Sequence, residues 1–393
     1  MDVLASYASV ENYADHLLFN KSPHNFISTM YPSTLTYSTA TMPTNSDDDD
    51  TTITPESIEE MYHEMQKLVS IVVPIFFGII AVSGFFGNTL VILVVLLNQQ
   101  MRSTTNLLIV NLAIADLLFV VFCVPFTATD YVTEIWPFGD LWCRMVQYLI
   151  VVTAFASIYT LVLMSIDRFL AVVHPIRSRL LRTEKITKIA ILTLWVAILG
   201  ISVPVPLSHG VLFEYDAEHH LSYAQCQFMQ NEFVTLSAYQ FSFLISSYLL
   251  PLMVISGLYV RMIMRLWRQG SGVRMSVESQ RGRKRVTRLV VVVVIAFASL
   301  WLPVQLILML KALELYHVNS NFKVILQIIA QTLAYTSSCI NPFLYAFLSD
   351  NFRKAFRKVS AECGNSYVGV ATGCLATIAG RSRGICLFFL AIN

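Results

Sequence analysis

Long apolar runs separated by short polar segments dominate the hydropathy pattern of this chain. Crossing the hydrocarbon core of a membrane takes roughly 20 apolar residues in a helix. Seven runs reach about that length with few or no charges, and they predict seven membrane-spanning helices. The runs are 68–97, 106–127, 145–166, 189–207, 233–260, 289–310 and 324–349.

Lys and Arg residues are unevenly distributed among the polar segments. The segments before the first run and after the second, fourth and sixth runs hold only five of the 27 Lys and Arg residues. Because positive charge concentrates on the cytoplasmic side of a membrane protein, we expect an extracellular N-terminus and a cytoplasmic C-terminus. We therefore predict a multi-pass protein of the plasma membrane.

The ends of the chain differ in composition from the predicted bundle at 68–349. Residues 1–67 are rich in Ser, Thr and Pro and include the run "DDDD", which is typical of a disordered tail. Residues 350–361 place two phenylalanines four apart among basic residues, which predicts an amphipathic helix on the inner leaflet. Residues 362–393 form a predicted cytoplasmic tail, in which Cys363 is a palmitoylation candidate. The predicted fold is an all-α membrane protein, a seven-helix bundle with a short eighth helix.

Composition excludes a soluble enzyme. The chain is 55% hydrophobic and 13% charged, whereas soluble domains carry about a quarter charged residues. The seven cysteines form no CxxC pair and no His-rich spacing, so no metal site is indicated. Neither a phosphate-binding loop nor a Ser/His/Asp set was found, and we expect no catalytic activity, no resident cofactor and no nucleic-acid partner.

A few strongly polar side chains lie inside the apolar runs. Asp116 falls in the middle of the second run, Asn88 in the first, and Asn341 in the last. Such groups are costly in a membrane unless they are paired or hydrated, so each is a functional candidate. The alternative is that they only hold helices together by hydrogen bonds. If Asp116 is ionised, Ser157 and Ser338 are suited to help it hold a sodium ion.

The last three runs each contain an internal proline, at Pro251, Pro303 and Pro342. Each proline removes a helix hydrogen bond and favours a kink. Phe297, Trp301 and Gln305 follow one another at intervals of four beside Pro303, so they share one helix face. This stripe fits either a packed core or a lever at the kink.

The ordered set of motifs resembles the rhodopsin-like (class A) G-protein-coupled receptors. The resemblance extends from residue 68 to about residue 358 and includes all seven runs. The motifs are Gly87 with Asn88, "LAIAD", Trp136 with Cys143, "DRF", Trp195, Pro251 with Tyr259, "FASLWLP" and "NPFLY".

The resemblance implies roles for individual residues. It implies a disulfide between Cys143 and Cys226 outside the membrane. Arg168 corresponds to the arginine that turns toward the G protein, and Trp301 to the residue whose shift transmits agonist binding. Other implied roles are a connector formed by Pro251, Ile158 and Phe297, and stabilisation of the active state by Tyr259, Tyr345 and the Asn341–Pro342 motif.

The inner end departs from the family pattern. Phe169 replaces the usual tyrosine after the Asp-Arg pair. Some members carry an acidic residue at the inner end of the sixth helix, where this chain has Arg283. We therefore expect Asp167 to be the main partner of Arg168, with Thr287 as a weaker one.

Ligand chemistry follows from the outer half of the runs. The family position that holds a cation-binding aspartate is Ile150, and the last run lacks the lysine of retinal proteins. Neutral amide and aromatic side chains predominate instead, and they suit a peptide backbone or a C-terminal amide, although helix packing is the alternative for each glutamine. The peptide-binding candidates are Asp130, Gln147, Tyr239, Gln240, Phe243, Gln305, Gln327, Gln331 and Tyr335.

Two stretches are similar to insect allatostatin-A receptors, relatives of galanin receptors: "WPFGDLWCRMVQYLIVV" and "MSVESQRGRKRVTRLVVVVVIAFASLWLPVQ" with their flanks. This resemblance implies amidated neuropeptides ending in Phe-Gly-Leu-amide as agonists and a heterotrimeric G protein as partner. Arrestin, receptor kinases and membrane lipids are further expected partners. The alternatives are a receptor for a galanin-like or kisspeptin-like peptide and, from another class, a transporter or channel.

Overall fold

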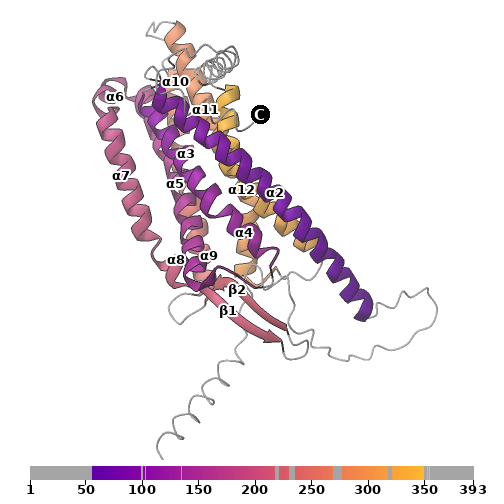
Figure 1. Ribbon diagram of the computed structural model, residues 1–393. Helices are drawn as coiled ribbons and strands as arrows, with labels where there is room; N and C mark the ends of the chain where they lie inside the picture. The colour runs from indigo at the N-terminus through magenta and orange to yellow at the C-terminus, as the bar shows by residue number, and fades with distance from the viewer. Residues whose placement is uncertain are drawn as a thin grey trace, which may run out of the picture.

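A bundle of long helices with a β-hairpin across one end makes up this structure, a computed structural model (Figure 1). The residues it describes are 55–98, 101, 103–133, 135–216, 221–229, 235–268, 277–316, 321–348, 352 and 354. The predicted tail at 362–393, with Cys363, lies outside them, as does most of 1–67. Of the predicted eighth helix, residues 352 and 354 are described and both are helical, so its full extent stays a prediction.

The elements follow the seven predicted runs closely. The helices of the first four runs are α2 (Pro55–Leu97), α3 (Thr104–Phe122), α4 (Val124–Asp130), α5 (Gly139–Val173), α7 (Glu184–Ile201) and α8 (Pro204–Leu207). The short helix α6 (Pro175–Leu181) lies between the third and fourth runs. The hairpin β1 (His209–Asp216) and β2 (Leu221–Phe228) precedes α9 (Leu236–Leu244), the π-helical turn η2 (Ile245–Leu249), α10 (Leu250–Arg268), α11 (Val277–Ala312) and α12 (Asn321–Leu348).

Within the described residues, six helical segments are long and apolar enough to cross a membrane. The helix of the last run, α12, is long enough, but its glutamines, serines and threonines make it less apolar than the others. The described residues thus contain helices in each of the seven predicted runs, with α12 in the last one, and the prediction of a seven-helix bundle is confirmed.

Hydroxyl side chains cap three of these helices at the N-terminus. Ser103 accepts a hydrogen bond from the backbone N–H of Asn106 at the start of α3. Thr183 caps α7 and Thr235 caps α9 in the same manner. Each cap satisfies one of the four orphan N–H groups at a helix start. As a result α3 and α7 begin before the runs 106–127 and 189–207, whereas α9 begins within the run 233–260.

Prolines interrupt two of the predicted spans. The second span breaks at Cys123, and Pro125 lies in the first turn of α4, where its missing N–H costs nothing. In the fifth span the turn η2 widens the helix just before Pro251, which has no N–H to donate to the preceding turn. The Tyr159 hydroxyl donates to the Ser246 carbonyl within this turn at 2.9 Å. A side chain from α5 thus satisfies a backbone group near the kink.

The core consists of two apolar layers around the central helix α5, which contacts α3, α7, α10 and α11. One layer includes Ile158, Phe297 and Tyr345, and it lies toward the end of the bundle that carries Arg168, called here the Arg168 end. The other includes Phe77 and Tyr335 and lies toward the hairpin end, the end covered by β1 and β2. Trp301 packs against both layers. It is therefore placed to couple them.

The hairpin was not predicted. β1 and β2 pair antiparallel, with Val211 opposite Cys226, and they lie across one end of the helices (Figure 1). In the sequence this segment is a polar connection without a long apolar run.

Two glycines of α2 let neighbouring helices approach closely. A Cβ built on Gly84 lies 2.7 Å from Val120 Cγ2 and 3.3 Å from Cys339 Cβ. A Cβ on Gly87 lies 3.0 Å from the ring of Pro342. By contrast, a Cβ on Gly78 meets no atom within 4 Å.

Gly84→Ala should destabilise the bundle, because Val120 and Cys339 must move to admit the methyl group. Overpacking of this kind costs about 1–3 kcal/mol, which exceeds the roughly 0.5–1 kcal/mol gained by replacing a helical glycine with alanine. Thermal unfolding in detergent should show a lower Tm for Gly84→Ala. Gly78→Ala, the matched control, should leave Tm unchanged or raise it, and an equal fall in both variants would contradict the prediction.

Candidate functional site: a cavity at the hairpin end and a polar network at the other

A cavity of about 190 Å³ lies under the hairpin, among the helix ends nearest to it. Its wall combines aromatic, aliphatic and amide side chains with three ionisable groups, Asp130, His209 and Lys311. The cavity is smaller than the roughly 300–1,000 Å³ typical of small-molecule pockets. Only one end of an extended ligand fits inside, and the rest must contact the mouth.

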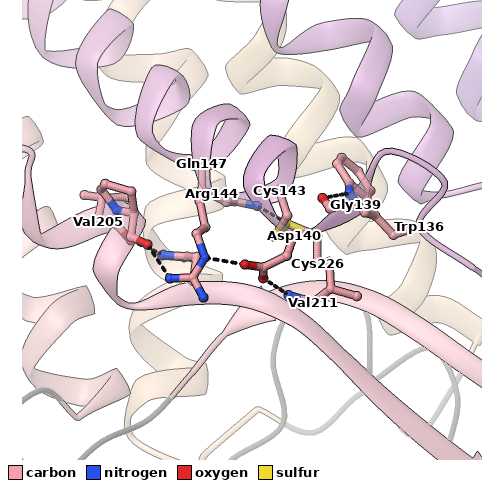
Figure 2. Close-up of a disulfide and its surroundings, with 11 residues drawn as sticks. Trp136, Gly139, Asp140, Cys143, Arg144, Gln147, Val205, Val211 and Cys226 are labelled. Carbon is pink, nitrogen blue, oxygen red and sulfur yellow. Dashed lines mark hydrogen bonds and ion pairs between the residues drawn. A yellow bond between two sulfur atoms is a disulfide. The ribbon is translucent and has the colours of Figure 1, made fainter.

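A disulfide between Cys143 of α5 and Cys226 of β2 holds the hairpin over this cavity (Figure 2). The Asp140 carboxylate accepts hydrogen bonds from the Val211 backbone N–H at 2.9 Å and from Arg144 Nε at 2.7 Å. Covalent and polar contacts thus attach both strands to the first turns of α5. The pairing implied by the family resemblance is present.

The Arg144 guanidinium also donates to the Pro206 carbonyl at 3.1 Å. The indole N–H of Trp136 donates to the Gly139 carbonyl at 3.0 Å. The loop before α5 and the short helix α8 are therefore joined to the same helix turn as the hairpin. These contacts hold the segments around the cavity mouth in fixed positions.

Most predicted ligand-binding residues line the cavity. Gln305 and Gln327 do not: the Gln305 amide donates to the Ser247 hydroxyl at 3.2 Å, and both side chains are buried elsewhere between helices. This matches the helix-packing alternative for these two glutamines. The predicted residues that do line it are Asp130, Gln147, Tyr239, Gln240, Phe243, Gln331 and Tyr335.

His209, which sequence reasoning missed, lies in the cavity wall at the start of β1. Its Nδ1 is 2.8 Å from the Val205 carbonyl. Because a carbonyl only accepts, Nδ1 carries the proton and Nε2 is left as an acceptor. Burial lowers the pKa of His209 to about 4, so the ring is neutral at pH 7. The hairpin brings this residue to the cavity, and no local motif marked it.

Trp301 lies between the cavity and the inner layers of the bundle. Its indole N–H donates to the Ser337 hydroxyl of α12 at 3.0 Å, and its ring stacks on Phe297 with centroids 5.6 Å apart. Phe297 and the fully buried Ile158 belong to the apolar layer toward the Arg168 end. Pro251 is also buried, and Pro303 lies inside α11 two residues after Trp301. The aromatic stripe is thus packed core and is also adjacent to the kink.

Asp116 is the centre of a buried polar cluster. Its carboxylate accepts from the Ser157 hydroxyl at 3.0 Å and from the Asn341 amide at 2.8 Å. Beside it is a small cavity of about 10 Å³. The Asn88 amide donates to the Ser338 carbonyl at 2.8 Å, so it joins α2 to α12. The predicted helix-joining hydrogen bonds are present, and the oxygen ligands at Asp116 also suit a small hard cation.

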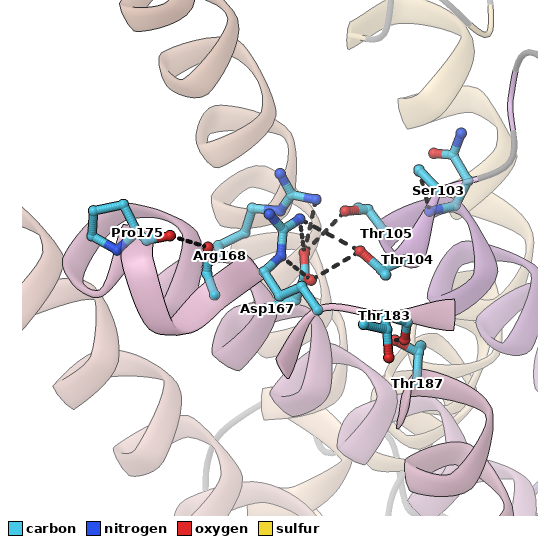
Figure 3. A network of polar contacts seen from close by, with 11 residues as sticks. Ser103, Thr104, Thr105, Asp167, Arg168, Pro175, Thr183 and Thr187 are labelled. Carbon is cyan, nitrogen blue, oxygen red and sulfur yellow. Dashed lines mark hydrogen bonds and ion pairs between the residues drawn. The ribbon is translucent and has the colours of Figure 1, made fainter. Parts of the chain in front are cut away.

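At the Arg168 end, Asp167 is the centre of a second network (Figure 3). Its carboxylate lies 2.9 Å from Arg168 Nη2. Arg182 binds both carboxylate oxygens, at 2.6 Å through Nε and 3.1 Å through Nη2. Thr105 and Thr104 of α3 add hydrogen bonds at 2.9 and 3.2 Å. One carboxylate therefore holds two guanidiniums and connects α5 to α3.

The expected pairing of Asp167 with Arg168 is observed, whereas Arg182 was missed. Arg182 follows α6, 15 residues after Asp167, and only the turn of the chain at α6 brings the two together. The side chains of Arg283 and Thr287 lie outside the described residues. Within the described part of the chain, Arg168 Nε is buried and makes no hydrogen bond. Arg168 is thus only partly satisfied in this conformation.

The two tyrosines implied in activation lie in the inner layer. The Tyr259 and Tyr345 hydroxyls are both buried and make no hydrogen bond with the described residues. Tyr345 stacks on Phe352 with centroids 5.5 Å apart. Buried hydroxyls without partners are costly. A rearrangement in which these hydroxyls formed hydrogen bonds with water or with each other would remove that cost.

Comparison with known proteins agrees with this geometry. The family model for seven-transmembrane receptors of the rhodopsin family matches residues 87–345. The allatostatin-A receptor of Bombyx mori is 58% identical over 296 residues, covering 75% of this chain and 81% of that protein. The galanin-like G-protein coupled receptor npr-9 of Caenorhabditis elegans is 34% identical, covering 77% of each chain. Galanin receptor type 2 of Mus musculus is 36% identical, covering 74% of this chain and 76% of that receptor.

Proposed function

The chain belongs to the rhodopsin family of seven-transmembrane receptors, and we propose that its agonist is an amidated neuropeptide of the allatostatin-A type. As a member of this family it is a multi-pass membrane receptor that binds a peptide and couples to a G protein, and it is not an enzyme. The observation that carries the ligand proposal is the 58% identity to the Bombyx mori allatostatin-A receptor. That identity is well above the 34% and 36% found for the galanin-type relatives.

The chemistry of the cavity supports the same ligand class. Gln147, Gln240 and Gln331 line it together with Tyr239, Phe243 and Tyr335. Amide side chains both donate and accept hydrogen bonds, as a peptide backbone and a C-terminal carboxamide require. The aromatic side chains offer apolar contact to aromatic or aliphatic side chains of the peptide. The small volume of the cavity suits one end of a peptide.

A chain of contacts runs from this cavity to the Arg168 end. An agonist in the cavity contacts α11 and α12, on which Trp301 and its hydrogen-bond partner Ser337 lie. Because Trp301 packs against both apolar layers and stacks on Phe297, a small shift of α11 changes both layers at once. Pro303 lets the inner half of α11 swing outward. Arg168 then leaves Asp167 and becomes available to the G protein.

The proposed orientation places the hairpin end outside the cell and the Arg168 end in the cytoplasm of the plasma membrane. The distribution of Lys and Arg supports it. It also places the disulfide in the oxidising environment in which such bonds persist. Arrestin, receptor kinases and anionic lipids of the inner leaflet are then proposed partners of the basic inner face.

A panel of peptides tests the ligand proposal. Cells expressing the full chain with a promiscuous G protein should respond to peptides ending in Phe-Gly-Leu-amide at far lower concentrations than to galanin-like or kisspeptin-like peptides. The free-acid forms of the same peptides control for the carboxamide. A response to galanin-like peptides alone would overturn the ligand and keep the receptor class. Peptide-independent solute flux would instead support the transporter or channel alternative.

Sodium is a second proposed ligand, at Asp116. Asp116 and the Ser157 hydroxyl would hold the ion, with Ser338 and Asn88 on the neighbouring helices, and the ion would stabilise the inactive conformation. Agonist binding by the wild-type receptor should weaken when sodium replaces potassium at constant ionic strength. Asp116→Asn should abolish the difference, and an unchanged sodium effect in that variant would contradict the site.

A further inference from the structure

Asp130 is a buried carboxylate in the wall of the ligand cavity, and it has no partner among the residues that the structure describes. It is the last residue of α4, its exposed fraction is 8%, and it lines the cavity. No hydrogen bond or ion pair reaches its side chain from the described residues. Asp116, Asp140 and Asp167 all have such partners. Aspartate is almost never buried unless it is paired, so Asp130 lacks a group that none of the described residues supplies.

The surroundings of Asp130 do not provide that group. The nearby Tyr335 hydroxyl is already engaged with the Thr127 hydroxyl at 3.1 Å. The cation of the cavity wall is Lys311, on α11. α11 packs against α9 and α12, whereas α4 packs against α2 and α3. The two charges therefore lie on different sides of the cavity, and His209 adds a neutral ring.

We propose that Asp130 is the subsite for a positively charged group of the peptide, a guanidinium or an ammonium. This inference rests on the proposed function and adds a charge requirement to it. A charged donor forms hydrogen bonds to a carboxylate that are about twice as strong as those of a neutral donor.

A cationic group of the peptide is therefore expected toward α4, where Asp130 lies, and not toward Lys311 on α11. A neutral peptide would leave Asp130 buried, dehydrated and unpaired, which is costly.

A double-mutant cycle between receptor and peptide tests the proposal. The probes are N-acetylated peptides ending in Phe-Gly-Leu-amide, with a single arginine at successive positions before the phenylalanine, and twins in which citrulline replaces that arginine. At the matching position, the wild-type receptor should bind the citrulline twin at least about tenfold more weakly. Asp130→Asn should lose the same factor for the arginine peptide and show no preference between the twins.

Three controls make each outcome decisive. Glu314→Gln removes an exposed carboxylate near the same end of the bundle, outside the cavity lining, and should retain the preference for arginine. Asp130→Glu keeps the charge and should retain part of the preference, which separates lost recognition from misfolding. Asp130→Lys should prefer a peptide with glutamate in place of the arginine.

The failures of the two proposals are distinguishable. If no peptide activates the wild-type receptor, the proposed function is wrong. If arginine and citrulline twins are equally potent at every position, or if Asp130→Asn weakens both twins equally, the Asp130 subsite is wrong. A loss of the preference for carboxamide over free acid, with the arginine preference intact, would reassign Asp130 to the peptide terminus.

Discussion

Arg168→Ala should abolish G-protein activation while leaving peptide binding at the cell surface intact. Arg168 lies at the end of the bundle opposite the cavity, so the variant keeps every residue of the cavity lining. Truncating one partner of a buried charge pair at an interface costs about 2–5 kcal/mol. At about 2.7 kcal/mol the agonist-stimulated response falls about 100-fold. Nucleotide exchange on purified G protein measures this loss directly.

Linkage provides an independent measurement for the same variant. Where the G protein raises agonist affinity, the agonist raises G-protein affinity by the same factor. Agonist affinity for Arg168→Ala in membranes should therefore no longer depend on guanine nucleotide. Arg179→Ala, an exposed arginine of α6, is the matched control and should keep the dependence. Loss of surface expression in Arg168→Ala alone would show that the residue stabilises the fold.

Asp167→Asn should raise signalling in the absence of agonist. The change removes the negative charge that holds Arg168 at 2.9 Å and Arg182 through both oxygens. Loss of one or two kcal/mol from the inactive conformation raises the active fraction by a factor of about 5–30. Second-messenger production, normalised to the number of receptors at the surface, measures the change.

The variant Arg182→Ala distinguishes the role of Arg182 from that of Arg168. It removes the bidentate contact but leaves Arg168 paired with Asp167, whose carboxylate is still held by Thr104 and Thr105. Basal signalling should then stay close to that of the wild type. Equal activation by Arg182→Ala and Asp167→Asn would show that restraint of α6, and not of Arg168, keeps the receptor inactive. Unchanged basal signalling in Asp167→Asn would refute the restraint altogether.

The polar residues of the Arg168 end show how far sequence reasoning reaches. The contact of Asp167 with Arg168 was expected because the two are adjacent and no acidic residue is found at the inner end of the sixth run. Arg182 was not expected, although it makes the shortest contact with that carboxylate, at 2.6 Å. Its position depends on the path of α6 after Pro175, and no periodicity in the sequence encodes that path.

The cavity shows the same division. Gln147, Gln331 and Tyr335 lie at positions that helical spacing assigns to the inside of the bundle, and they line the cavity. Gln305 and Gln327 have equivalent positions in the pattern, but their side chains pack between helices. Gln327 and Gln331 are four residues apart on the same helix face, so helical spacing does not separate a packed position from one that lines the cavity.

By itself the sequence determined the spans, the family and the chemistry of both ends of this receptor. A run of about 20 apolar residues is stable as a helix across a membrane and has no comparable alternative. Tertiary structure decided which groups meet. It places His209 at the cavity and Arg182 on Asp167, and it gives Asp130 no partner among the described residues. These outcomes join residues of separate elements, and Cys143 and Cys226 are 83 residues apart. They depend on where helices and hairpin pack, which hydrophobic periodicity leaves open.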